Sequence, residues 1–323
     1  MPLATADVIG ILGDNLRLRK SVLPLSSKVT TRWTEGLGLP RGGETVLYTG
    51  MMYQLIPYIE GLVRAVDRLG DSWMGSYTKL GRRVNRLVNI SAFMARPSAA
   101  ERAVYDRVPI DVVHLLRRAG VRFGALYEDD LYSGALAYDL GLDEIVAEHA
   151  AKVLAAFRKH GVKQVITIDP HTTTMLRSVY PGILEGYDIG VSSYLEVLTE
   201  KGVAGNGHRV RPIDGEVVVH DSCVFARYEG VVDEPRALLA AAGLTLRDPE
   251  NAGRQTWCCG GPVESLYPAK AAANAEKRVA QLRAAGDEAV TMCPMCFVNL
   301  SSAAGSTMRF RDISEYLREA FAS

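Results

Sequence analysis

Cysteine is absent before residue 223 of this 323-residue chain, and several other features are absent throughout. No stretch of 18 uncharged apolar residues occurs, so we expect no transmembrane helix. We also expect no secretory signal peptide in the opening residues, Met1–Asp7. Neither sign of charge is in excess, because 37 Lys and Arg residues balance 37 Asp and Glu residues. A protein that binds nucleic acid or anionic membranes mainly through its net charge is therefore not expected.

A dinucleotide-binding fingerprint is missing as well. Glycines are frequent between residues 36 and 43, but none opens a helix after a strand with the G-x-G-x-x-G spacing that such a site requires. A short helical pattern at residues 8–16 precedes these glycines. We predict that residues 1–44 form an N-terminal arm that packs on the first domain.

Helical periodicity marks several longer segments of the chain. Apolar residues recur at helical spacing in Met51–Leu69, Asp111–Ala119, Leu142–His160 and Pro268–Ala285. A basic stretch, Lys79–Arg86, also predicts a helix, whose charges we interpret as a solvated face. Strand patterns precede and follow these helices, at residues 45–48, 121–127 and 164–168 in the first half.

All five cysteines lie in the last third of the chain, in loops that we expect to follow strands. Residues 217–219 are an apolar run before the first cysteine, and residues 289–292 are one before the last two. Intervals of 34 and 33 residues separate an adjacent cysteine pair from the cysteines on either side. Open α/β sheets place their ligand sites at the edge where the strands end. We therefore expect the thiols to gather at one sheet edge: Cys223, Cys258, Cys259, Cys293 and Cys296.

Thiolates gathered in this way suit a soft metal centre. One zinc ion takes four ligands in a tetrahedron, whereas an iron–sulfur cluster contains several irons that cysteine thiolates hold. Five cysteines exceed what one zinc needs, and neighbours such as Cys258 and Cys259 rarely face one ion together. The pattern favours an iron–sulfur cluster, with a structural zinc site and metal-free thiols as the alternatives. The odd cysteine number and the lack of an export signal predict a cytoplasmic protein.

The five-cysteine pattern, with Cys-Cys-Gly-Gly at its centre, resembles the CCG or cysteine-rich domain found in the cysteine-rich subunit of heterodisulfide reductase and in its relatives. Those relatives include iron–sulfur subunits of glycolate and lactate oxidation systems and an unusual succinate dehydrogenase subunit. His220–Cys223, with Arg227 following, is similar to the family's first-cysteine segment, although the second interval is slightly short. The resemblance implies that all five cysteines hold one 4Fe–4S cluster, which is non-cubane in the best-understood members.

The cysteine-free part of the chain repeats the order of the cysteine region, which indicates an internal duplication. The corresponding segments are 46–50 with 217–222, 132–134 with 258–260, and 169–172 with 293–296. Strands and helices alternate in both halves, so we predict an α/β fold of two similar lobes with mainly parallel sheets, related by pseudo-two-fold symmetry. The N-terminal lobe, residues 45–205, has a degenerate repeat without cysteine, and we expect it to bind no cluster. The C-terminal lobe, residues 206–323, has the complete motif.

Two histidines fall on loops at the predicted ligand edge. His171 lies in the segment that corresponds to the C-x-x-C loop, and His220 precedes Cys223 by three residues. A histidine changes charge near neutral pH and is able to donate a proton. Both are therefore candidate catalytic residues, and the alternative is that each orders its loop by hydrogen bonding.

The resemblance implies an enzyme, an iron–sulfur oxidoreductase subunit that acts on sulfur donors. Such a subunit passes electrons between a partner's redox centre and a disulfide or thiol substrate, and its implied partners are a ferredoxin-like iron–sulfur subunit and a flavoprotein subunit. One alternative is an electron-transfer or anchoring subunit of a dehydrogenase for succinate, glycolate or lactate. Another is a zinc-stabilised scaffold protein without redox activity.

Overall fold

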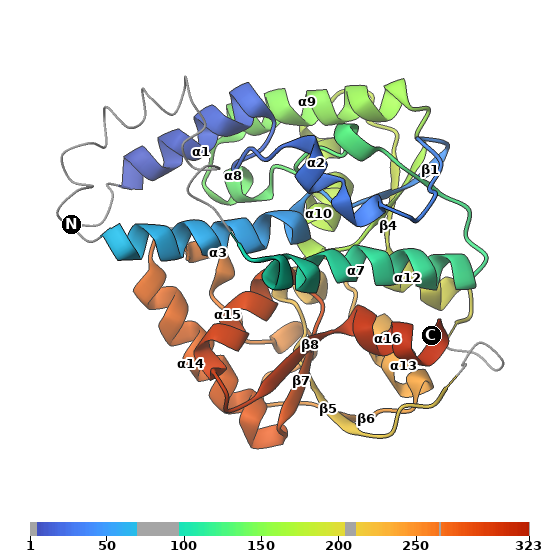
Figure 1. Cartoon of the computed structure of the whole chain (residues 1–323), viewed down its shortest axis with the longest axis vertical. Coiled ribbons are helices and arrows are strands. Elements are labelled where there is room, and N and C mark those ends of the chain that lie inside the picture. The colour runs from blue at the N-terminus through green and yellow to red at the C-terminus, as the bar shows by residue number, and fades with distance from the viewer. Residues whose placement is uncertain (1–4, 70–96, 204–210, 265, 323) are drawn as a thin grey trace.

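The computed structural model describes residues 5–69, 97–203, 211–264 and 266–322, whose strands form two parallel four-stranded sheets. The first sheet has the order β2-β1-β3-β4 and the second the order β6-β5-β7-β8. Figure 1 shows the first sheet in the upper half of the molecule and the second in the lower half. The strands are β1 (Thr45–Tyr48), β2 (Gly124–Ala125), β3 (Gln164–Thr167), β4 (Gly190–Ser193), β5 (Glu216–Val219), β6 (Thr245–Arg247), β7 (Glu288–Thr291) and β8 (Arg309–Asp312).

Helices surround both sheets, as fully parallel sheets require because both of their faces must be covered. Those associated with the first sheet are α1 (Thr5–Arg19), α2 (Ser27–Thr30), α3 (Met52–Leu69), α7 (Ala99–Arg118), α8 (Ala135–Asp139), α9 (Asp143–Lys159), α10 (Pro170–Thr174), α11 (Tyr180–Ile183) and α12 (Tyr194–Glu200). Those associated with the second sheet are α13 (Asp233–Ala242), α14 (Pro268–Ala285), α15 (Pro294–Ala304) and α16 (Ile313–Phe321). Each lobe also contains one turn of π-helix, η3 (Met175–Val179) and η4 (Phe225–Glu229).

The two lobes have the same architecture, which confirms the predicted fold class. Strand order and parallel pairing are identical when β1 to β4 are matched with β5 to β8. The glycines that end the matched segments 132–134 and 258–260, Gly134 and Gly260, both have left-handed backbone conformations, with φ of 86° and 88°. The last strand of each lobe ends in a capping residue, Ser193 or Asp312, whose side chain accepts from the first turn of the next helix. The repeat therefore extends to details of loop and helix ends.

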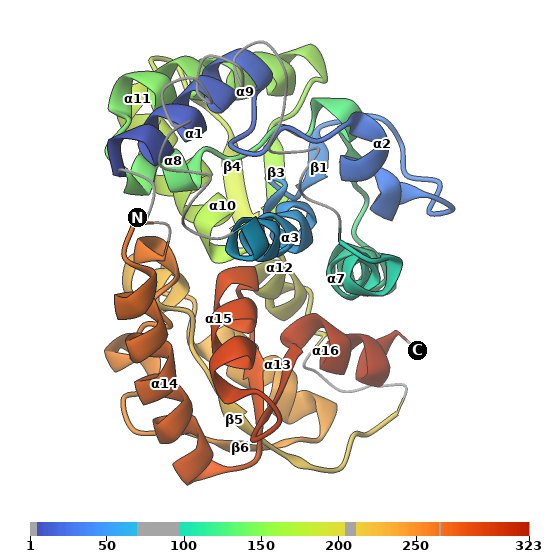
Figure 2. The same cartoon turned by 60° about the vertical axis from the view of Figure 1, so that its left-hand side comes forward.

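A layer of helices joins the lobes into one core. Figure 2 shows α3, α7 and α12 of the upper lobe above α15 and α16 of the lower lobe, and α7 packs on α16 while α3 packs on α15. One hydrophobic cluster contains Leu47 and Ile166 from the first sheet together with Val217 and Val290 from the second. The two sites at the sheet edges are thus held in a fixed relation by shared apolar packing.

Most of the predicted helices lie close to their expected bounds. α14 matches its prediction, while α7 begins at Ala99, earlier than expected, because Ser98 and Glu101 form a capping box. The strand expected over residues 121–127 is only two residues long. The basic segment Lys79–Arg86 lies outside the described residues, and the proposed limits of arm and lobes remain predictions. The arm does contain α1, which packs on α9.

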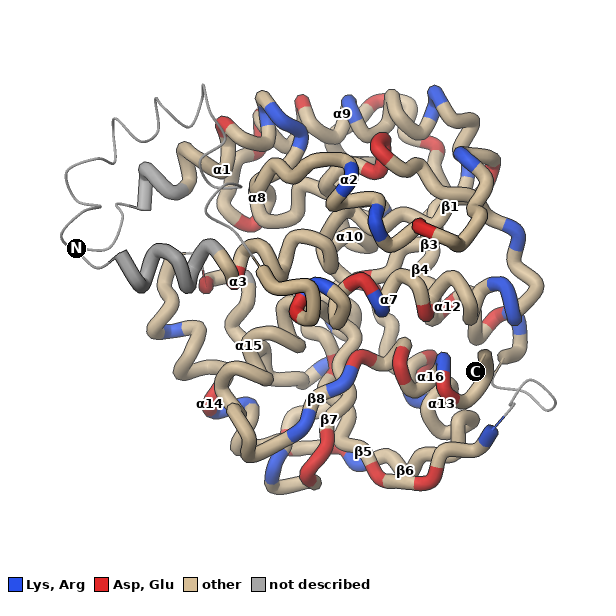
Figure 3. The backbone as a smooth tube through the Cα atoms, in the orientation of Figure 1, with Lys and Arg blue, Asp and Glu red and all other residues tan. Residues whose placement is uncertain are grey.

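Charged residues of both signs are interspersed over the described parts of both lobes, as Figure 3 shows. Among these described parts, no helix has both the length and the apolar character that crossing a bilayer requires. The cytoplasmic location stays a prediction.

A buried carboxyl at the lobe interface predicts a pH-dependent stability. The Tyr53 hydroxyl of α3 donates to Asp312 at the start of α16, at 2.7 Å. Burial raises the pKa of Asp312 from 3.8 to about 7, against hydrogen bonds from Ser314 and Tyr53 that lower it. Because the folded pKa lies above the unfolded one, Asp312 destabilises the fold increasingly as pH rises from about 4 to about 7.

We therefore expect the melting temperature of the unchanged protein to fall between pH 6 and pH 7.5. Asp312→Asn should reduce this fall, since the amide still caps α16 but does not ionise. Asp188→Asn, which changes an exposed carboxylate in the loop before β4, is the control and should leave the pH dependence as in the unchanged protein. Melting temperatures at the two pH values measure the effect. An identical pH dependence in all three proteins would contradict the assignment.

Candidate metal centre

The C-terminal sheet places all five cysteines at the edge where its parallel strands end. Cys223 follows β5, and Cys293 follows β7 and occupies the position before α15. Cys296 lies in the first turn of α15, while Cys258 and Cys259 lie in the loop between β6 and α14. Parallel pairing of β5 with β7 brings these loops together, as predicted.

The sulfur atoms form a continuous row of contacts. The Sγ atoms of Cys223 and Cys258 are 3.7 Å apart. Hydrogen-bond contacts then join Cys258 to Cys259, Cys259 to Cys296, and Cys296 to Cys293. Cys259, Cys293 and Cys296 are buried, whereas Cys223 and Cys258 are partly exposed. Within the described residues, no three His, Cys, Asp or Glu side chains are placed to share a single metal ion.

Hydrogen bonding along this row favours thiolates at Cys258 and Cys293. Hydrogen bonds from Cys223 and Cys259 lower the pKa of the Cys258 thiol. The same bond to Cys258, together with burial, raises the pKa of Cys223. Burial raises the pKa of Cys293, but hydrogen bonds from Cys296 and His171 outweigh it and hold that pKa well below its ordinary value. Because soft thiolates are the donors that iron–sulfur clusters use, the donor set fits such a cluster.

The loops that carry the cysteines are held rigidly. The buried Asp221 carboxylate pairs with Arg236 at 2.9 Å and accepts from the Gly253 backbone N–H at 2.7 Å. Its backbone oxygen accepts from Thr256, which precedes the cysteine pair, at 2.9 Å. Gly260 permits the next turn, because an added Cβ would lie 2.7 Å from the Ala271 carbonyl oxygen in a left-handed conformation. The sulfur positions are thus fixed by neutral and charged hydrogen bonds in the loops.

His220 lies behind the cysteine row and is buried. Arg278 donates from Nε to its Nδ1 atom at 3.1 Å. Burial lowers the pKa of His220 to about 3, and the charge of Arg278 lowers it further. The ring is therefore neutral at physiological pH, which favours a hydrogen-bonding role, and proton donation by His220 stays a prediction.

His171 comes from the other lobe and contacts the cysteine row at Cys293. It lies in the first turn of α10, one residue after Pro170 and in the loop that matches the C-x-x-C segment. Burial lowers the pKa of His171, but the hydrogen bond to Cys293 and the charges of Cys293, Asp169 and Asp139 together raise it to about 9. The structure thus brings His171 to the cysteines, although sequence matching alone placed it in a separate lobe.

The matching positions of the N-terminal lobe carry polar side chains instead of cysteine. Ser133 and Thr172 stand where Cys259 and Cys296 stand, and Asp169 stands where Cys293 stands. All three are fully buried, and each has a side-chain oxygen that finds no hydrogen-bond partner within the described part of the chain. The Asp169 carboxylate accepts from the Thr172 backbone at 2.9 Å, as a helix cap does. This loop is therefore held by hydrogen bonding at positions where the C-terminal lobe has cysteines.

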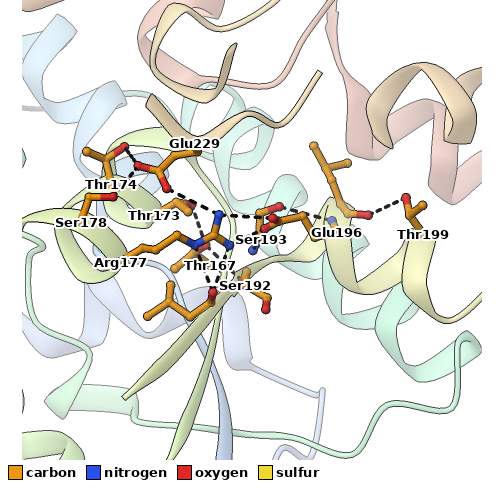
Figure 4. A network of polar contacts seen from close by, with 12 residues as sticks. Thr167, Thr173, Thr174, Arg177, Ser178, Ser192, Ser193, Glu196, Thr199 and Glu229 are labelled. Carbon is orange, nitrogen blue, oxygen red and sulfur yellow. Dashed lines mark hydrogen bonds and ion pairs between the residues drawn. The ribbon is translucent and has the colours of Figure 1, made fainter. Parts of the chain in front are cut away.

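A polar network ties the first cysteine loop to the N-terminal lobe, and it was not predicted from the sequence. Figure 4 shows Arg177 of η3 between the carboxylates of Glu196 and Glu229. Glu229 ends η4, the helical turn that follows Cys223, and its side chain is only 1% exposed. It accepts from Thr174 at 2.7 Å and from Ser178 at 3.1 Å. The network fixes the η4 turn against the lobe that supplies His171.

Arg278 is a second residue that sequence reasoning missed. It lies on α14 in phase with the buried residues Ala271, Ala275 and Leu282, at the helical spacing of an apolar face. The sequence signal for Arg278 is its position on this apolar face. A charged side chain that is buried with apolar neighbours needs a specific partner in the folded protein.

Fold and site together define a two-lobed α/β protein with a cysteine-lined centre at the sheet edge of its second lobe. Residues 217–301 match the family model of the cysteine-rich domain CCG. This match, and relatives named as subunits of heterodisulfide reductases, confirm the resemblance that the cysteine pattern indicates. The C-terminal lobe therefore contains a CCG cysteine-rich domain, and its presence supports an iron–sulfur cluster at the five cysteines.

Relatives with known names belong to several redox systems. The chain is 32% identical to EtfAB:quinone oxidoreductase of Syntrophomonas wolfei, over 67% of this chain and 32% of that protein. It is 30% identical to the probable iron–sulfur-binding oxidoreductase FadF of Bacillus subtilis, over 60% of this chain and 28% of that protein. It is 27% identical to a subunit of the dihydromethanophenazine:CoB–CoM heterodisulfide reductase of Methanosarcina barkeri, over 64% of this chain and 53% of that protein. The matched region thus spans from under a third to about half of these relatives.

The cysteine row predicts that loss of one buried sulfur removes iron. Cys259 is central, because its sulfur contacts those of both Cys258 and Cys296. We expect Cys259→Ala, purified without oxygen, to retain little of the iron of the unchanged protein. Ser133→Ala is the matched control from the other lobe and should keep its iron, because that hydroxyl has no partner to lose. Equal iron in all three proteins would refute the ligand assignment.

Proposed function

We propose that the chain is an iron–sulfur oxidoreductase subunit that passes electrons between a partner redox subunit and a disulfide or thiol substrate. All five cysteines would hold one 4Fe–4S cluster, and the cysteine-free lobe would hold none. The observation that supports this most directly is the contact between His171 of the N-terminal lobe and Cys293 of the cysteine row. A thiolate-lined centre and a proton-carrying group from a second surface are the two components that reversible disulfide chemistry needs.

Reduction of a disulfide consumes two electrons and two protons and yields two thiols. The cluster, when bound, supplies electrons one at a time and supplies an iron able to interact with sulfur. The chain's own residues hold the cluster, limit water near it and position the proton. We assign proton donation to His171, because its ring contacts Cys293 while Asp169 and Asp139 act on it electrostatically.

The implied partners are a ferredoxin-like iron–sulfur subunit and a flavoprotein subunit. Several of the relatives are named as subunits of reductases, including a subunit of the CoM/CoB fumarate reductase from Methanothermobacter marburgensis. The chain spans about a third or less of the length of several of these relatives.

A second candidate is a pure electron-transfer subunit without a sulfur substrate. The names of two relatives, a quinone oxidoreductase and an iron–sulfur-binding oxidoreductase, favour it. In that case His171 would only shape the cluster's surroundings. Disulfide-dependent oxidation of a reduced viologen dye by the purified complex distinguishes the two, because an electron-transfer subunit shows none.

His171→Ala tests the proton-donor assignment. Loss of a positioned general acid typically lowers turnover on the order of 100-fold or more, and we expect such a loss in disulfide reduction with the iron content and the EPR signal retained. His160→Ala is the matched control, because His160 lies before β3 at the opposite edge of the same sheet. Unchanged turnover in His171→Ala would show that this histidine only orders its loop.

A further inference from the structure

Arg278 is a fully buried cation whose hydrogen bonds all go to neutral groups. Its side chain is 0% exposed. Besides His220, it donates to the Glu250 carbonyl oxygen at 2.8 Å, to the Gln281 side chain at 2.9 Å and to the Thr256 hydroxyl at 3.4 Å. Within the described residues it forms no ion pair, and the nearby Asp221 carboxylate is already paired with Arg236.

A buried charge without a counter-charge is strongly unfavourable, because its removal from water has a large free-energy cost that only an opposite charge or a dense hydrogen-bond network offsets. The charges that act on Arg278 come from Asp221, then from Cys296, then from Glu250. Thiolates bound to an iron–sulfur cluster carry negative charge at this edge. Because Asp221 is paired with Arg236 and Glu250 is exposed to solvent, the buried Cys296 of the cysteine row is the neighbour whose negative charge is left to offset that of Arg278.

Arg278 also determines which nitrogen of His220 carries the proton. Because the Arg278 Nε–H donates to Nδ1, that atom must be the acceptor, and the proton of the neutral ring lies on Nε2. The Nε2 atom is buried and has no hydrogen-bond partner among the residues that the structure describes. The ring lies close enough to the row for the charge of Cys258 to act on it. A buried N–H without a partner is therefore available to a sulfur of the centre.

We propose that Arg278 is the counter-charge of the cluster and that, through His220, it fixes an N–H donor toward the cluster's sulfurs, so that the pair raises its reduction potential. This inference rests on the proposed function, since it requires a bound cluster. A nearby positive charge and N–H···S hydrogen bonds both stabilise the reduced state, which carries one more negative charge. Arg278 and His220 are positioning residues in this account and do not touch the substrate.

The test is an EPR-monitored redox titration of the full chain, purified without oxygen. Arg278→Gln should shift the midpoint potential to lower values, because it removes the charge. Arg278→Lys should restore most of the potential, because it retains the charge. Arg309→Gln removes the same charge from a side chain that is 68% exposed and serves as the control. Its potential should equal that of the unchanged protein, because solvent and salt screen an exposed charge.

A second measurement addresses the hydrogen bond. In His220→Phe the potential should also fall, and an exchangeable proton coupling seen by ENDOR in the unchanged protein should disappear. If Arg278→Gln does not retain iron, His220→Phe decides the matter. Potentials equal to that of the unchanged protein in every iron-loaded variant would overturn this inference alone. Absence of a cluster from the unchanged protein would instead overturn the proposed function.

Discussion

The site depends on the parallel pairing of β5 with β7. Val218 and Val219 lie beside Ala289 and Val290 in register, so the loops that follow the two strands leave the sheet at the same level. That pairing brings Cys223 and Cys293 to the same edge of the sheet, although they are far apart in the sequence. The apolar burial of these strands stabilises the sheet, and the sheet in turn positions the sulfurs. No individual loop contains enough ligands to do this alone.

The same pairing in the N-terminal lobe has been put to a different use. The loops after β2 and β3 lie at an equivalent edge, but they carry serine, aspartate and threonine at the matching positions. Hydrogen bonds, such as the one from the Thr172 backbone to Asp169, hold this edge together. The lobe contributes to the cysteine centre by reaching across to it, with His171 at Cys293 and with the Arg177 network at Glu229. Because of this asymmetry, the second lobe carries the cysteine row and the first lobe supplies the polar side chains that face it.

Sequence patterns predicted the fold class, the duplication and the gathering of the cysteines, because these depend on local periodicity and on strand ends. They did not predict the side-chain contacts that Glu229 and Arg278 make with residues far away in the sequence. Glu229 is an ordinary surface residue in sequence terms, yet it is buried by α10 and η3 of the other lobe. Arg278 was recognisable in principle from its place on an apolar stripe, but its partner His220 is 58 residues away. The ligand roles of the cysteines and the catalytic role of His171 remain predictions.

The most direct test of the account is the iron, sulfide and zinc content of the full chain purified without oxygen, together with its EPR spectrum. The account predicts a brown protein with about four irons and four sulfides per chain, as a single 4Fe–4S cluster requires. It also predicts one EPR-active centre upon partial oxidation or reduction. A colourless protein that carries one zinc per chain and no iron would contradict it.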